Sequence, residues 1–424
     1  MLDIRFVRAN PELVKENIRK KFQDEKIELV DQILELDKSM REAKAQVDAL
    51  RNQRNVDSKK IGALIAQGKK EEAEAAKLAV SGMDTTLTDL EKQAEDLSAR
   101  LRELMMVIPN IIDESVPIGR DDSENVELEQ FGEPIIPDFE VPYHIDIMEA
   151  RDGVELENAG RVSGSGFYYL KGDVARLHSA ILSYARDFMI DRGFTYYIPP
   201  YMIRSSVVTG VMSFAEMENM MYKIEGEDLY LIGTSEHSMI GKFKEALLTT
   251  EDLPQCMTSY SPCFRKEVGS HGIEERGVYR IHQFEKQEML IVCEPEKSPE
   301  WFTKLYMHTV DFFRSMDIPV RLLECCSGDL ADLKVKSVDV EAWSPRQKKY
   351  FEVGSCSNLG DAQARRLGLR VRAEKGNYPP HTLNNTVVAP PRMLIAFLEN
   401  NLNADGSVSI PAPLRMYMGG KERI

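Results

Sequence analysis

The sequence predicts an α+β protein in which a domain built on an antiparallel sheet follows a long helical arm. No proline occurs between Pro11 and Pro109, although the chain contains 20 prolines, and proline disrupts helix interiors. Beyond this region, strand-like runs and helical segments lack the regular strand–helix–strand repeat of a parallel sheet. Because 424 residues exceed the usual size of a single core, we expect an arm over residues 1–118 and a second domain over residues 119–424.

The arm is predicted to be an antiparallel coiled coil. Mainly apolar residues recur with the average spacing of about 3.5 residues that is typical of coiled coils. The seam positions are Ile33, Leu36, Met40, Ala43, Val47, Leu50, Arg54 and Ile61, and then Met83, Leu87, Leu90, Ala94, Leu97, Leu101 and Leu104. Residues 66–70 form a turn-like interruption, so the two helices fold back on each other, and each leg of about 30 residues reaches about 45 Å.

Charge is divided unevenly between the two legs. Residues 41–70 contain eight basic and three acidic side chains, and residues 71–100 contain three basic and eight acidic ones, whereas the whole chain carries a net charge of −15. The overall charge argues against indiscriminate binding to nucleic acids and makes the basic leg the place for a polyanion to bind. In an alternative interpretation, these charges only solvate the coiled coil.

The second domain begins after an acidic, proline-containing connector that runs from Pro109 to about Pro142. We expect an amphipathic helix over residues 174–190 and strands over residues 229–232, 259–265, 278–291 and 350–353. Gly164-Ser165-Gly166 is predicted to be a turn, because a phosphate-binding loop requires a helix after it and a strand-like run follows instead.

Zinc, disulfide and membrane functions are not expected. The six cysteines include no C-x-x-C pair, and the seven histidines form no H-E-x-x-H motif, so reduced and mostly buried thiols are predicted. No run approaches the roughly 18 apolar residues needed to cross a bilayer. The N-terminus also lacks the apolar stretch of a secretory signal, and we therefore expect a cytoplasmic protein with no membrane partner.

The most informative block is Phe264-Arg265-Lys266-Glu267, a loop with glycines at Gly269, Gly272 and Gly277, and then residues 280–288. Two strands joined by a loop would bring Arg265 close to the second strand. Phe284 and Glu288 are four residues apart on that strand and therefore face the same side of the sheet. An arginine, an aromatic ring and a carboxylate on one surface suit a nucleotide and an amino acid, although composition alone also allows ordinary surface pairs.

This block resembles motif 2 of the class II aminoacyl-tRNA synthetases in its seryl form, which is Phe-Arg-x-Glu, a loop and His-Gln-Phe-x-Lys-x-Glu. Gly193-Phe194 and Pro200 resemble motif 1, and residues 382–386 with residues 392–396 resemble motif 3. Thr234-Ser235-Glu236, Ser355-Cys356-Ser357-Asn358 and Gln363-Ala364-Arg365-Arg366 are also typical of the seryl-tRNA synthetases. The resemblance covers essentially the whole chain in order and implies a class II catalytic domain.

The resemblance implies that serine is activated with ATP and Mg²⁺ and then transferred to serine tRNA; whether selenocysteine tRNA is also a substrate stays open. The ATP-binding residues it implies are Arg265, Lys266, Glu267, Ile281, Phe284, Glu352, Val353, Gly354, Ser355 and Arg392, with Glu352 and Ser355 as Mg²⁺ ligands. The serine-binding residues it implies are Thr234, Ser235, Glu236, Arg265, Glu288, Asn384 and Thr386. Arg265, Glu288 and Arg392 are the expected catalytic residues. Phe284 and Arg392 are expected to sandwich the adenine.

The family also implies that motif 1 builds a homodimer and that the arm binds tRNA. Two departures from the family pattern concern the site: Gly354 replaces a serine, and Ile273-Glu274-Glu275 replaces a basic-acidic-threonine stretch. One alternative is a catalytically altered paralogue with a binding or regulatory role, which would lack Arg265, Glu288 or Arg392. Another is a ligase that passes serine to a carrier protein, which would not need the arm.

Overall fold

The computed structural model describes residues 1–267 and 277–424, which separate into two compact units. One unit is Leu2–Pro109, and the other contains Met1 and Asn110–Ile424. Residues 110–118, which we expected in the arm, lie in the second unit because the backbone N–H groups of Asn110 and Asp113 donate to the carbonyls of Asp332 and Val335. Gly269, Gly272 and Ile273-Glu274-Glu275 lie outside the described residues.

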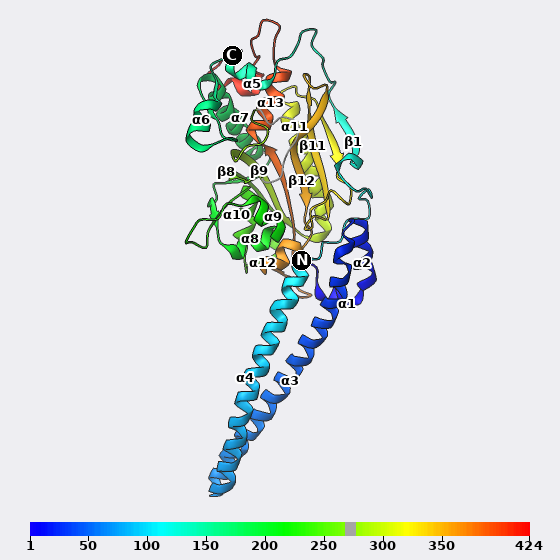
Figure 1. Cartoon of the computed structure of the whole chain (residues 1–424), viewed down its shortest axis with the longest axis vertical. Coiled ribbons are helices and arrows are strands. Elements are labelled where there is room, and N and C mark those ends of the chain that lie inside the picture. Colours follow the sequence, from blue (N-terminus) through cyan, green and yellow to red (C-terminus); the bar gives the residue numbers. More distant parts are fainter. Residues whose placement is uncertain (268–276) are drawn as a thin grey trace. The chain divides into compact units, whose positions relative to one another are not determined.

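The arm is an antiparallel helical hairpin, as predicted. The long helices α3 (Ile27–Ala66) and α4 (Lys70–Val107) lie side by side in Figure 1, after the short helices α1 (Ile4–Ala9) and α2 (Pro11–Lys20). The legs are longer than expected, with 40 and 38 residues. Gly68 adopts φ +77° in the turn between them, a conformation that glycine reaches without steric cost. The predicted seam is confirmed by buried positions on both legs, including Ile33, Ala43, Val47, Leu87, Ala94 and Leu101.

A buried carboxylate also holds the base of this hairpin together. Asp37 on α3 is 1% exposed, and its Oδ2 lies 2.8 Å from Nε of Arg8 on α1 and 3.0 Å from Nε of Arg41. Burial raises the pKa of Asp37, but the hydrogen bonds from Arg8 and Arg41 outweigh it and hold the pKa below its usual value. Asp37 therefore links α1 to α3 as long as it is ionised.

The second unit is built on an eight-stranded sheet in the order β1-β10-β11-β12-β14-β9-β8-β4. All neighbouring strands are antiparallel except β4 and β8, which are parallel. The strands are β1 (Val126–Phe131), β4 (Thr195–Tyr197), β8 (Gln255–Phe264), β9 (Gln283–Cys293), β10 (Val320–Glu324), β11 (Lys336–Ser344), β12 (Lys349–Asn358) and β14 (His381–Val388). The prediction of an antiparallel sheet with flanking helices is confirmed.

Helices cover both faces of this sheet. On one face, α7 (Gly172–Ile190), α11 (Ser298–Arg314) and α13 (Pro390–Asn400) pack through a core that includes Phe312, Phe313 and Phe397. Shorter helices lie by the other face, among them α10 near β8 and β9 (Figure 1): α8 (Ser205–Val211), α9 (Phe214–Met220), α10 (Ser235–Gly241) and α12 (Ala362–Leu367). The helix predicted over residues 174–190 is α7.

The remaining elements are short. The helices are α5 (His144–Glu149), α6 (Leu156–Ser163) and α14 (Ala412–Arg415), and single 3-10 turns occur at Asp24–Lys26, Asp122–Glu124, Thr250–Asp252 and Pro295–Lys297. Within residues 1–267 and 277–424, three strand pairs lie outside the main sheet: β2 (Val154–Glu155) with β3 (Tyr169–Leu170), β5 (Met202–Ile203) with β6 (Tyr230–Leu231), and β7 (Leu247–Thr249) with β13 (Arg370–Arg372). Gly164 and Gly166 both have positive φ, so the predicted turn is present. All six cysteines are free, and none of the helices in the described ranges is long and apolar enough to cross a membrane.

Replacing Asp37 with alanine should loosen α1 from α3. We expect a cost of about 2 kcal/mol, because two guanidinium groups lose a charge-assisted acceptor. Hydrogen exchange of the amides in residues 4–9 should become faster in the intact protein. In the parent protein, the protection factors of the same amides, which correct for the intrinsic pH dependence of exchange, should also fall below the usual pKa range of aspartate, once Asp37 is protonated.

Asp31 provides the matched control, since it accepts from Lys15 at 2.7 Å but is 64% exposed. Exposed pairs contribute little, and Asp31→Ala should leave exchange in α1 unchanged. Equal effects of the two substitutions would contradict the role given to Asp37.

Candidate active site

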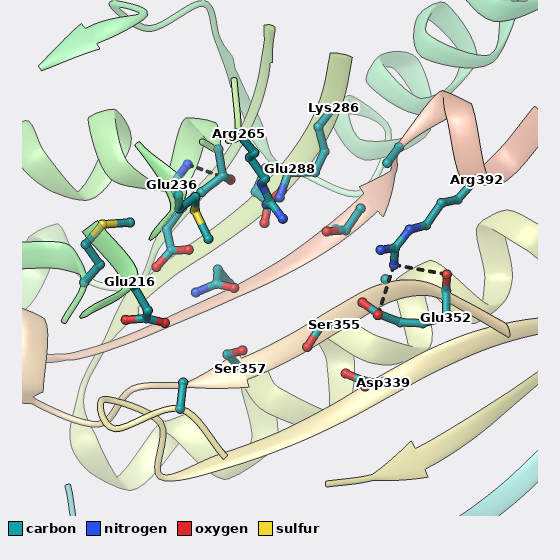
Figure 2. A pocket seen from close by; sticks show the side chains of 18 of the residues that line it. Glu216, Glu236, Arg265, Lys286, Glu288, Asp339, Glu352, Ser355, Ser357 and Arg392 are labelled. Atoms are coloured by element: carbon teal, nitrogen blue, oxygen red, sulfur yellow. Dashed lines mark hydrogen bonds and ion pairs between the residues drawn. The ribbon is translucent and has the colours of Figure 1, made fainter. Parts of the chain in front are cut away.

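A cavity of about 400 Å³ lies on the sheet face that carries α10. Its walls come from α10, β9, β12, β14 and the start of α13 (Figure 2). Fourteen of the predicted site residues line it: Thr234, Glu236, Arg265, Glu267, Ile281, Phe284, Glu288, Glu352, Val353, Gly354, Ser355, Asn384, Thr386 and Arg392. Residues that are far apart in the sequence are thus brought into one site by three neighbouring strands and two helix ends.

Two predicted residues do not line the cavity. The ammonium of Lys266 donates to the carbonyl of Glu218 at 3.3 Å, and the hydroxyl of Ser259 donates to that of the fully buried Ser235 at 2.7 Å. Both side chains have structural partners, so only their neighbours in the motifs reach the site.

Strand alternation selects the residues that face the cavity. Phe284 and Glu288 both line it, as predicted for positions four apart on β9. On β14, Asn384 and Thr386 line the cavity, while Asn385 between them donates to the carbonyl of Leu305 on α11 at 2.9 Å. The polar pattern of β14 therefore serves two faces of the sheet.

A β-bulge brings Glu352 and Ser355 to the same face. Residues three apart on a regular strand face opposite sides. On β12, however, Glu352 pairs with Glu341 and Gly354 pairs with Val340, which leaves Val353 as an extra residue. This irregularity reverses the alternation, and both side chains consequently line the cavity.

Arg392 and Glu352 form an ion pair at one end of the cavity, as Figure 2 shows. Nη1 of Arg392 lies 3.0 Å from Oε2 of Glu352 and also donates to its backbone carbonyl at 3.2 Å. The charge of Arg392 holds the pKa of Glu352 below its usual value, although burial opposes this shift. The guanidinium lies 4.7 Å from the ring centre of Tyr279.

Arg265 lies near the middle of the cavity and is held by backbone carbonyls. Its Nε donates to the carbonyl of Gly233 at 3.0 Å, and its backbone N–H donates to the carbonyl of His282 at 2.9 Å. The guanidinium lies 5.3 Å from the ring centre of Phe284. These contacts fix the start of the side chain and direct its charge towards β9 (Figure 2).

The other end of the cavity collects acidic groups. Nζ of Lys286 lies 2.6 Å from Oε2 of Glu288, and both side chains are almost completely buried. Glu236 is nearby on α10, where burial raises its pKa to about 7, the negative charge of Glu288 adds to the rise, and a hydrogen bond from Gln363 opposes it. A small cation that enters this region would meet two carboxylates and one ammonium.

Comparison with known proteins decides the family. Residues 1–112 match the seryl-tRNA synthetase N-terminal domain, and residues 220–401 match the class II tRNA synthetase core domain of the G, H, P, S and T enzymes. The serine--tRNA ligase of Methanoculleus marisnigri is 40% identical, with 100% of both chains covered. The chain belongs to the seryl-tRNA synthetase family.

Solved structures of two seryl-tRNA synthetases have the same fold. The enzyme from Pyrococcus horikoshii, crystallised with ATP, has a TM-score of 0.93 and 37% identity over 100% of this chain and 99% of that one. The enzyme from Naegleria fowleri, crystallised with AMP, has a TM-score of 0.88 and 31% identity, with 100% and 98% covered. The function is therefore that of a serine--tRNA ligase, with ATP, serine and tRNA as substrates and Mg²⁺ as cofactor.

The residues around Ser355 fit the Mg²⁺ that this family uses. Asp339 lies opposite Ser355 in the β11–β12 register and is hydrogen-bonded to it. Burial and the charge of Glu352 raise the pKa of Asp339 to about 7. Mg²⁺ prefers oxygen ligands and keeps several water molecules. No group of three or more His, Cys, Asp or Glu side chains in the described ranges forms a complete metal site, so phosphate and water oxygens would have to complete the coordination.

Several cavity residues were missed by sequence reasoning. Tyr279 lies under Arg392, Lys286 pairs with Glu288, Asp339 faces Ser355 and Lys334 lies 3.5 Å from the hydroxyl of Ser355. Lys286 belongs to the motif 2 block, two residues before the predicted site residue Glu288, so the sequence could have indicated that it lies in the site. Lys334 and Asp339 carry no such local signal, because only tertiary contacts bring them to the site.

Gly354 allows β12 and β14 to pack closely at the bulge. A Cβ atom at this position would lie 3.3 Å from the carbonyl oxygen of Thr386 and 3.5 Å from its Cβ. We expect Gly354→Ser to cost less than about 1 kcal/mol, because a shift of a few tenths of an ångström accommodates it. Gly354→Val should cost about 1 to 3 kcal/mol through overpacking. Urea denaturation measures both values, and a tolerated valine would show that this contact does not constrain the strands.

Proposed function

We propose that this cavity makes seryl-adenylate in an in-line reaction that depends on positioning and charge neutralisation. The observation that carries the proposal is the convergence of Arg265, Glu288 and Arg392 on a single cavity. The serine carboxylate attacks the α-phosphate and expels pyrophosphate, and a terminal ribose hydroxyl of tRNA then attacks the activated carbonyl. Neither step requires a nucleophilic side chain.

Arg265 is proposed to bridge the serine carboxylate and the α-phosphate, because a planar guanidinium can bind two anions at once. Phe284 and Arg392 are proposed to hold the adenine between them, and Glu267 and the backbone at Ile281 bind its edge. The guanidinium of Arg392 lies over the ring of Tyr279, which supports an aromatic environment for the adenine. Glu352 and Ser355 hold Mg²⁺, which supplies positive charge to the phosphates when bound.

Serine is proposed to bind at the acidic end. Its ammonium is held by Glu288, Glu236 and the Thr234 segment, and its hydroxyl is held by Asn384 and Thr386. Asn384 and Thr386 are each 8% exposed, and an alanine substrate would leave their polar groups without partners. Pyrophosphate exchange and aminoacylation with serine, threonine and alanine test this assignment.

Removing the Arg265 guanidinium should abolish adenylate formation. We expect Arg265→Ala to lower serine-dependent ATP–pyrophosphate exchange by at least about a hundredfold, since charge-assisted bonds to two anions are lost. Arg280 provides a control, since its Nη1 lies 3.6 Å from Oε2 of Glu267 and it is 47% exposed. Arg280→Ala should reduce exchange much less, and near-normal exchange in Arg265→Ala would remove Arg265 from the mechanism.

The arm is proposed to bind tRNA through its basic leg, and the charging of tRNA is proposed to take place in the cytoplasm. Part of the basic charge is already engaged: Arg51 lies 2.7 Å from Glu91, and Arg54 lies 2.7 Å from Asp84. Lys60 pairs with Asp57 on its own helix. Lys44, Lys59 and Lys70 are exposed and have no ion pair among the described residues, so we expect each of them to contribute more to binding than a paired residue does.

Replacing residues 35–100 with a short linker should spare pyrophosphate exchange, because every proposed serine and ATP contact lies beyond residue 230. Aminoacylation should fall steeply, since tRNA loses its contact and much of the counterion-release free energy. Neutralising Arg51, Arg54, Lys59 and Lys60 should flatten the salt dependence of tRNA binding. A truncated protein that charges tRNA at the parental rate would refute this role of the arm.

We also propose a homodimer formed through the motif 1 region around α7 and β4. Four apolar side chains on or beside these elements are 44–66% exposed, namely Tyr169, Ile190, Ile198 and Met202, and an interface between copies would bury such residues. Sedimentation should show a dimer at micromolar concentration and a shift towards monomer in Ile198→Glu. Leu78→Glu on the arm, which is 75% exposed, is the control. A fully active parental monomer would refute the dimer.

A further inference from the structure

Gln363 connects three parts of the protein that do not adjoin in sequence. It lies on α12, is 1% exposed, and its Nε2 donates to Oε1 of Glu236 at 2.8 Å and to the carbonyl of Val211 at 3.2 Å. Its Oε1 accepts from the hydroxyl of Thr382 on β14 at 2.6 Å. The amide thus joins the proposed serine pocket to the end of α8 and to the sheet.

The orientation of this amide is determined by its partners. The carbonyl of Val211 can only accept a hydrogen bond, so the NH₂ group of Gln363 must face it. The same NH₂ group then faces Glu236, and Thr382 donates to the remaining oxygen. Because every polar atom of the amide has a partner, a reversed amide would place two acceptors in contact at Val211 and at Glu236.

We propose that Gln363 is a positioning residue for serine, holding the Glu236 carboxylate in its ionised form and in one rotation at the wall of the serine pocket. This inference rests on the proposed role of Glu236. Glu236 depends on this donor, because no ammonium or guanidinium group among the described residues forms an ion pair with its carboxylate. Glu288, by contrast, has Lys286 at 2.6 Å.

The charged groups around Glu236 act on its ionisation in opposite directions, so the loss of one hydrogen-bond donor can shift the balance. Glu288 and Lys286 face it from β9, and Lys334 faces it from the segment before β11, with opposing effects on its ionisation. Burial raises its pKa to about 7, and the Gln363 bond opposes this rise. Loss of the donor therefore shifts Glu236 towards its neutral form, which cannot attract the serine ammonium.

Two substitutions at Gln363 separate positioning from packing. Gln363→Leu removes the donor, and the serine KM relative to the parent should rise at least about tenfold at neutral pH, with the ATP KM changed less than about twofold. Gln363→Glu keeps the shape. Two adjacent carboxyls share a proton at low pH, so the protonated carboxyl of this variant can donate to Glu236 in place of the native amide, while the Val211 carbonyl loses its donor.

The serine KM of Gln363→Glu relative to the parent should accordingly lie within about threefold at pH 6 and rise at least about tenfold by pH 9, as the shared proton is lost. Gln130→Glu is the matched control, because Gln130 donates to Oε1 of Glu127 at 2.8 Å on the surface. Its KM ratio should stay near one at both pH values. Pyrophosphate exchange gives all of these constants.

Specific outcomes would overturn the proposal. These are a pH-independent ratio for Gln363→Glu, a serine KM within about twofold of the parent for Gln363→Leu, or equal increases in the serine and ATP KM. If Gln363→Leu does not fold, the isosteric glutamate variant decides alone. A parental protein without serine-dependent exchange would refute the proposed function itself, whereas normal parental exchange with unaffected Gln363 variants would refute only this inference.

Discussion

The structure of the catalytic unit depends on the compensation of buried charge. An isolated charge is costly to bury, and removing one partner of a buried pair costs more than the pair contributes. The cavity holds Arg392 beside Glu352 and Lys286 beside Glu288, so each of these four charged groups has an opposite charge next to it before any substrate enters. In our proposal, ATP and serine bind to these charges, and little reorganisation is needed in the reaction.

The sheet makes this arrangement possible. Three adjacent strands, β12, β14 and β9, present alternate side chains to the cavity and the others to the core under α11. The bulge at Val353 adds the one change in alternation that places Glu352 and Ser355 together. A rigid frame of this kind holds catalytic groups more accurately than loops do.

The arm follows different physics. Its two helices bury a narrow seam and expose most of their charged residues. The arm therefore extends over a long distance but has little hydrophobic core of its own. Cross-helix ion pairs, such as that of Arg54 with Asp84, join basic residues of the first leg to acidic residues of the second. The uneven charge seen in the sequence therefore serves both helix pairing and, in our proposal, the binding of tRNA.

The sequence alone determined the helical hairpin, its turn at Gly68 and the antiparallel sheet, because these follow from local periodicity and from the absence of proline. It also identified fourteen of the residues that line the cavity, since residues such as Arg265, Phe284, Glu288 and Arg392 stand in short contiguous motifs. Tertiary structure decided the rest. The edge strand β1 lies in what the sequence showed only as an acidic connector, and Lys266 and Ser235 do not line the cavity. Lys334, Asp339 and Gln363 reach their partners only through tertiary packing. Such contacts join residues far apart in the chain, and no local pattern encodes them.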